Sequence, residues 1–251
     1  MTDQPVLAVK HLGLQIGGAR IIDDVFLSIA KGEMLGVIGP NGAGKTTLFN
    51  LISGVLSPTK GTVELEGKDV TSEPIHRRAR AGLGRTFQTS SLFPALTALE
   101  NVRLVAQSTL RGEISIFRFP NRSDEATRIA VKQLEEVGLA RHIATVAGVL
   151  SHGDKRKLEI AMLLAGEPRV MLLDEPMAGV GSADVPGLVE LIRTVHRSGR
   201  TILMVEHHMD VLLGLVDRVA VMHHGQLLAI GTPAEVMADP QVQSAYLGGS
   251  V

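Results

Sequence analysis

The stretch Gly39-Pro40-Asn41-Gly42-Ala43-Gly44-Lys45-Thr46 fits the pattern G-x-x-x-x-G-K-[ST]. It follows a short apolar run at residues 34–39 and precedes a helical pattern at 46–53, so it joins a strand to a helix. Its glycines let the backbone curl until several N–H groups point at one anion, and the start of a helix adds a positive dipole end. A Gly-rich turn before an ordinary helix is the alternative, but the strand–loop–helix order favours a phosphate-binding loop.

The side chains of this loop predict what it binds. Lys45 is placed to bridge the β- and γ-phosphates of a nucleoside triphosphate, and the Thr46 hydroxyl is expected to be a ligand for Mg²⁺. The residues that we expect to contact the nucleotide are Gly39, Pro40, Asn41, Gly42, Ala43, Gly44, Lys45, Thr46 and Thr47. A phosphate loop alone does not distinguish kinases, GTPases and transport ATPases.

A second apolar run, at residues 170–173, ends in Asp174 and Glu175. A buried strand that ends in two acids places them at the carboxyl edge of the sheet, where α/β proteins bind ligands. Adjacent strand residues point to opposite faces, so the two acids have different roles. We expect Asp174 to hold Mg²⁺ through water and Glu175 to polarise the attacking water; two solvated acids at a strand end are the alternative.

The segment Leu150-Ser151-His152-Gly153-Asp154 precedes an amphipathic helix. Ser151 is a candidate N-cap with Asp154 three residues later, a variant of the capping box. The same helix start could instead bind a phosphate through the Ser151 hydroxyl and the Gly153 N–H.

Along the rest of the chain, strand patterns and helix patterns follow one another as in an α/β protein. Residues 7–29 alternate apolar and polar around Gly17-Gly18 and predict antiparallel β structure. Helical periodicity at 97–110 and 123–138 predicts an inserted helical subdomain. Further strands are predicted at 169–173, 201–205 and 218–222. The expected fold is a P-loop NTPase core of class α/β with an N-terminal antiparallel β region and an inserted helical subdomain.

We expect one domain over residues 1–251. Its predicted parts are an α/β core at 1–88 and about 151–235, a helical subdomain at about 89–150, and a C-terminal tail at 236–251.

Composition excludes several classes of function. Lys plus Arg is 25 and Asp plus Glu is 26, a net charge of −1, which argues against a nucleic-acid binder. Aromatic residues make up 3% and cysteine is absent, which argues against base stacking, disulfides and thiolate chemistry. We find neither a secretory signal in the first residues nor a run of 18 apolar residues.

Together the motifs resemble those of the ATP-binding subunits of ATP-binding cassette (ABC) transporters. The resemblance covers essentially the whole chain and rests on motifs in the family's order: the phosphate loop, Gln88, Ser151–Asp154, Asp174-Glu175 and His207. It implies a head-to-tail dimer in which each ATP lies between one phosphate loop and the other subunit's signature of Ser151, His152, Gly153 and Asp154. It also implies that Gln88 is a Mg²⁺ or water ligand and that His207 contacts the γ-phosphate; a polar residue closing a strand is the alternative for His207.

A narrower resemblance is to the branched-chain amino-acid importers. It rests on five stretches of the sequence: residues 39–50, Arg85-Thr86-Phe87-Gln88, Leu158-Glu159-Ile160-Ala161, Val205-Glu206-His207 and Ala245-Tyr246-Leu247-Gly248. The loop Arg-Thr-Phe-Gln is similar to the G-type of the two ATPase subunits of these systems.

This resemblance implies a peripheral subunit on the cytoplasmic face of the inner membrane. Its implied partners are a second ATPase (another copy or an F-type relative), two permease subunits and, indirectly, a periplasmic binding protein. Alternatives are a urea or short-chain amide importer, a lipopolysaccharide or lipid exporter, a soluble ABC ATPase acting on nucleic acid, and a small P-loop kinase.

Three further expectations concern single positions. Many ABC ATPases stack adenine on an aromatic residue about two dozen positions before the phosphate loop; here that position is Ile16. The basic run Arg77-Arg78-Ala79-Arg80 with Arg85 is expected to be a solvated helix face rather than a phosphate or lipid contact. His223-His224 is expected at a hairpin edge rather than in a metal site.

Overall fold

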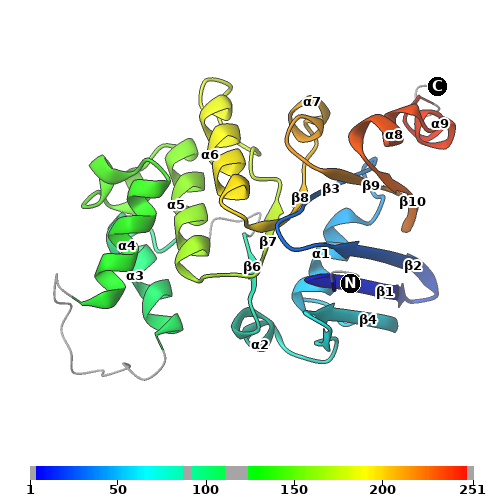
Figure 1. Cartoon of the computed structure of the whole chain (residues 1–251), viewed down its shortest axis with the longest axis horizontal. Helices are drawn as coiled ribbons and strands as arrows, with labels where there is room; N and C mark the ends of the chain where they lie inside the picture. The colour runs from blue at the N-terminus through cyan, green and yellow to red at the C-terminus, as the bar shows by residue number, and fades with distance from the viewer. Residues whose placement is uncertain (1–3, 87–91, 111–123, 248–251) are drawn as a thin grey trace. The chain divides into compact units, whose positions relative to one another are not determined.

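The structure is a computed structural model and describes residues 4–86, 92–110 and 124–247 (Figure 1). The chain forms two compact units. The first unit comprises Met1–Arg85, Arg169–Glu175 and Arg193–Val251, and the second comprises Thr86–Pro168 and Pro176–Ile192. The predicted boundaries of the helical subdomain, about 89–150, stay a prediction.

A six-stranded sheet is the centre of the first unit. Its strand order is β10-β9-β3-β8-β7-β6, and all neighbours are parallel except β10 and β9. The strands are β3 (Met34–Ile38), β6 (Leu83–Arg85), β7 (Val170–Asp174), β8 (Thr201–Val205), β9 (Arg218–His223) and β10 (Gln226–Gly231). Every residue of β3, β7 and β8 is buried, as expected of parallel strands covered on both faces.

The predicted antiparallel β region is confirmed as a second sheet of order β2-β1-β4-β5. Its strands are β1 (Leu7–Ile16), β2 (Ala19–Ile29), β4 (Lys60–Leu65) and β5 (Lys68–Asp69). β1 and β2 form a hairpin whose turn residues Gly17 and Gly18 both have positive φ, the conformation that a two-residue hairpin turn requires.

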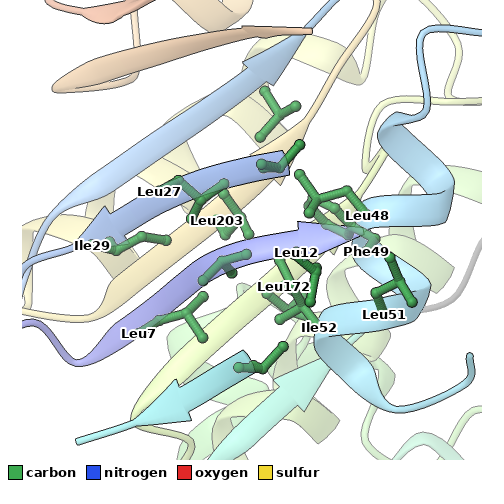
Figure 2. Packing of buried hydrophobic residues seen from close by; sticks show 14 of the residues in the cluster. Leu7, Leu12, Leu27, Ile29, Leu48, Phe49, Leu51, Ile52, Leu172 and Leu203 are labelled. Atoms are coloured by element: carbon green, nitrogen blue, oxygen red, sulfur yellow. The ribbon is translucent and has the colours of Figure 1, made fainter. Parts of the chain in front are cut away.

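Helix α1 (Lys45–Ser53) packs its apolar face into the core of the first unit. Figure 2 shows Leu48 and Phe49 of this helix beside Leu12 of β1 and Leu172 of β7, so both sheets contribute to one core. The helix ends at Gly54, whose φ of 81° lets its N–H reach Leu51 O.

The second unit is built on three helices that pack against one another: α3 (Ala98–Thr109), α4 (Glu125–Glu136) and α5 (His152–Ala165). They confirm the helical patterns at 97–110 and 123–138. Each starts at a residue whose side chain accepts a backbone N–H, namely Thr97, Asp124 and Ser151. Two 3₁₀ turns, η1 (Ala140–His142) and η2 (Ala147–Val149), lie between α4 and α5.

The other helices are α2 (Ile75–Arg80), α6 (Val185–Arg197), α7 (Met209–Leu213), α8 (Pro233–Ala238) and α9 (Pro240–Leu247). The β9–β10 hairpin confirms the expected place of His223, which pairs with Gln226. Within the described ranges, every helix is too short or too polar to cross a bilayer.

The predicted solvated basic face is wrong for two of its arginines. The side chain of Arg77 is 65% exposed, whereas Arg78 is only 2% exposed and the side chain of Arg85 only 8%. Arg78 donates to backbone carbonyls, and Arg85 pairs with Asp174. The long aliphatic part of an arginine can be buried when the guanidinium finds acceptors.

Candidate nucleotide-binding site

The phosphate loop connects β3 to α1 at the carboxyl edge of the parallel sheet. A Cβ at Gly39 would lie 2.3 Å from Met222 O, so a larger residue there would displace β9 or the loop. Gly44 caps α1 with a φ of 100°. The turn after β9 supports the loop, because Gly225 N–H donates to Ala43 O at 3.0 Å.

Lys45 lies inside the loop and is 6% exposed. Its Nζ donates to Gly39 O at 2.7 Å and to Pro40 O at 3.0 Å. Burial lowers the pKa of Lys45, and the charge of Glu175 partly opposes this shift. An ammonium has three N–H donors, so Lys45 can bind a phosphate oxygen while it still braces the loop.

Asp174 is the last residue of β7 and is 1% exposed. Its Oδ2 accepts a hydrogen bond from Arg85 Nη2 at 2.8 Å. Burial raises the pKa of Asp174, although the bond and the charge of Arg85 oppose this shift. The fold therefore brings a buried carboxylate to the sheet edge at which the phosphate loop begins.

Glu175 leaves the strand in a left-handed conformation, with φ 49°. Its N–H donates to Val205 O at 3.0 Å, and its Oε1 lies 2.8 Å from His207 Nε2. A left-handed conformation at a non-glycine residue costs about 1–2 kcal/mol, and Glu66 and Glu167 adopt it as well. The turn directs Glu175 toward His207, which follows the neighbouring strand β8.

The donor set fits Mg²⁺. This ion prefers oxygen ligands and is held in phosphate sites by one or two protein groups, with phosphates and water completing the octahedron. Asp174 and Thr46 supply a carboxylate and a hydroxyl in the same unit. Among the residues that the structure describes, no group of three or more His, Cys, Asp or Glu is placed to hold a metal ion. Gln88 lies outside the described residues.

The Ser151 segment belongs to the second unit and confirms the predicted cap. Ser151 Oγ accepts the Asp154 N–H at 3.1 Å and donates to Asp154 Oδ2 at 2.9 Å. Asp154 Oδ1 accepts from Lys157 Nζ at 3.3 Å. Ser151 and His152 are exposed and Gly153 is buried, with its Cβ position 3.0 Å from Asp184. The role of this segment toward a nucleotide stays a prediction.

Ile16 is the last residue of β1 and is 57% exposed. An exposed aliphatic side chain at a hairpin end can cover the face of a base, and the place of adenine at Ile16 stays a prediction.

The sequence reasoning missed two residues of this site. Glu206 is 3% exposed and accepts from His207 N–H at 3.1 Å; His208 Nδ1 lies 3.3 Å from its Oε2. Arg85 is the second. Its signal was the period of two in β6, which places Arg85 on the same face as buried Leu83.

The chain is similar to known transporter subunits over nearly its full length. A family described as "ABC transporter" matches residues 22–178, and one described as "Branched-chain amino acid ATP-binding cassette transporter" matches 226–251. The chain is 38% identical to the high-affinity branched-chain amino acid transport ATP-binding protein LivG of Salmonella typhimurium, over 98% of each chain.

Solved structures of ATP-binding cassettes are also similar to this chain. The ADP conformation of MJ1267, an ATP-binding cassette of an ABC transporter, has a TM-score of 0.84 and 31% identity, over 97% of this chain and 99% of that one. The dimeric, post-hydrolysis state of the cassette MJ0796 bound to ADP and Pi has a TM-score of 0.77 and 25% identity, over 90% and 98%. With its phosphate loop and acidic strand end, the chain belongs to the ABC transporter family as an ATP-binding cassette.

Proposed function

We propose that this chain hydrolyses ATP to drive import of branched-chain amino acids through two permease subunits. The observation that carries the hydrolytic part is the group of Lys45, Glu175 and His207 at one sheet edge, with Glu175 Oε1 2.8 Å from His207 Nε2. An acid that only ends a strand would need no imidazole partner.

In this proposal Glu175, His207 and Lys45 act on different atoms of the reaction. Glu175 accepts the proton of the water that attacks the γ-phosphorus. His207 holds the Glu175 carboxylate through Nε2 and contacts the γ-phosphate, while Lys45 stabilises the charge on the β- and γ-phosphate oxygens. ADP and phosphate are the products.

Mg²⁺ would be held by Thr46, Asp174 and Gln88. When bound, it neutralises charge on the β- and γ-phosphates. Asp174 serves this role from a buried position, where a carboxylate interacts strongly with a cation.

We further propose the head-to-tail dimer implied by the family. Ser151 Oγ and the Gly153 N–H would bind the ATP held by the other subunit's phosphate loop, with His152 and Asp154 completing that helix start. The dimeric relative described above supports this arrangement. The second ATPase would be another copy or an F-type relative, and the dimer would lie on the cytoplasmic face of the inner membrane.

The cargo is proposed from similarity, because ATPase subunits of this kind do not contact the transported molecule. Support comes from residues 226–251, which match the family described as "Branched-chain amino acid ATP-binding cassette transporter", and from the relative LivG. A periplasmic binding protein would deliver the amino acid to the permeases, and nucleic acid has no role.

Glu175→Gln tests the hydrolytic part. We expect ATP binding to persist while hydrolysis slows by about 10²–10⁴-fold, since the amide cannot accept the proton. Glu64→Gln is the matched control; Glu64 pairs with Lys10 on the antiparallel sheet and should leave hydrolysis unchanged. Wild-type hydrolysis by Glu175→Gln would remove Glu175 from the mechanism.

Transport in proteoliposomes tests the cargo. The chain, its permeases and the binding protein should take up leucine in an ATP-dependent manner. ATP-dependent uptake of urea, or extrusion of lipid, without leucine uptake would contradict the proposed cargo and leave the ATPase assignment intact.

A further inference from the structure

Arg85 connects two parts of the nucleotide site. Its Nη2 donates to Asp174 Oδ2 at 2.8 Å, while its Nη1 donates to Asn50 Oδ1 at 2.8 Å and to Ser53 Oγ at 2.6 Å. The guanidinium carbon lies 5.9 Å from the centre of the Phe49 ring. Because Asn50, Ser53 and Phe49 belong to α1, the arginine connects the helix of the phosphate loop to the acid at the end of β7.

This arrangement is poorly explained as a device for stability. The side chains of Arg85 and Asp174 are 8% and 0% exposed. Burying two charges costs as much as their attraction returns, so apolar residues of the same size would often be at least as stable. A planar guanidinium held at two nitrogens does provide orientation, because it fixes the carboxylate that it contacts.

We infer that Arg85 is a positioning residue that orients the Asp174 carboxylate for Mg²⁺ and so sets the affinity of the nucleotide site for this ion. The inference rests on the proposed function, in which Asp174 is a Mg²⁺ ligand. Groups that orient a metal ligand typically contribute 10–100-fold to metal affinity.

The test measures binding in the full chain. A fluorescent, non-hydrolysable ATP analogue is titrated into wild type and Arg85→Lys, first in EDTA and then at increasing Mg²⁺. Lysine keeps the charge but cannot hold Asp174, Asn50 and Ser53 in one plane. We expect the Mg²⁺ concentration at half-saturation to rise by about 10–100-fold, with affinity in EDTA within about twofold of wild type.

Arg78→Lys is the matched control, because Arg78 is also a buried arginine of the same unit but donates to backbone carbonyls away from Asp174. It should lower the melting temperature without changing the Mg²⁺ titration. Asn50→Ala is the second variant, for the case that Arg85→Lys does not fold. It removes one of the two acceptors of Arg85 Nη1 and leaves Ser53 Oγ, so it should shift half-saturation in the same direction by a smaller factor.

An unchanged Mg²⁺ titration of Arg85→Lys or of folded Asn50→Ala would overturn the inference. So would an equal loss of affinity with and without Mg²⁺, which would give Arg85 a purely structural role. If the wild-type protein bound the analogue without any response to Mg²⁺, the magnesium part of the proposed function would fail first, and the inference with it.

Discussion

Arg78→Met should destabilise the protein strongly although it lies outside the nucleotide site. Arg78 Nη1 donates to Leu51 O and Ile52 O, both at 2.7 Å, and so satisfies carbonyls at the end of α1. Leu51 O also accepts from Gly54 N–H and keeps this bond in the variant. The acceptor that loses its donor is therefore mainly Ile52 O. One orphaned buried acceptor costs about 1–3 kcal/mol, and each net bond to a charged donor is worth about 1.5–3 kcal/mol.

Two further acceptors, Glu73 O and Thr71 O, are only partly buried and can rehydrate. Methionine also removes the cost of burying the guanidinium, which lowers the pKa of Arg78 in the native protein. The net expectation is a loss of about 2–4 kcal/mol in the free energy of unfolding. For a chain of this size the melting temperature should fall by about 4–16 °C.

Urea unfolding followed by far-UV circular dichroism is the assay, because the chain has no Trp and a single Tyr. Arg77→Met is the control from the same helix: Arg77 is 65% exposed and pairs with Glu73 on the surface, so its loss should cost less than about 0.5 kcal/mol. If Arg78→Met lowered the free energy of unfolding by no more than Arg77→Met does, the buried carbonyls would have found other donors and the reasoning would be refuted.

Two further predictions concern the base and the helical unit. Ile16→Phe should tighten ATP binding by about 2- to 10-fold through aromatic stacking, measured by calorimetry; unchanged or weaker affinity would place adenine elsewhere. Thr97→Ala should lower the free energy of unfolding by about 1 kcal/mol, because it removes the N-cap of α3. The Thr97 backbone N–H and, to a smaller extent, its hydroxyl donate to Glu100 and lower the pKa of that carboxyl from 4.5, so this stabilisation is present above pH 4.5 and is lost as pH falls through the native pKa. Alanine removes only the hydroxyl bond, so the difference between Thr97→Ala and wild type should narrow in acid, and a constant difference would contradict a role of the hydroxyl bond to Glu100.

The phosphate loop and the cap at Ser151 could be predicted because their geometry is local. A glycine pattern between a strand and a helix, or a serine three residues before an acid, determines contacts within a few residues. In the structure Ser151 Oγ accepts the Asp154 N–H, three residues away. The strands that end in Asp174 and Val205 were predictable for the same reason, from apolar runs alone.

The burial of Arg78 and Arg85 could not be predicted from local sequence patterns. In the sequence they are two positions of one basic stretch: nothing local distinguishes Arg78 from exposed Arg77, and the only local signal for Arg85 is the alternation within the three residues of β6. Their acceptors lie far along the chain: Arg78 reaches Leu51 over 27 positions, and Arg85 reaches Asp174 over 89.

By itself, the sequence determined the buried central strands β3, β7, β8 and β9, the phosphate loop and the pair of acids, because each depends on backbone preferences and apolar periodicity over short distances. Only the tertiary structure decided which charges are buried. Parallel pairing of β6 with β7 places Arg85 opposite Leu172 and beside Asp174, and a charge can stay in that interior only where its partners are brought to it.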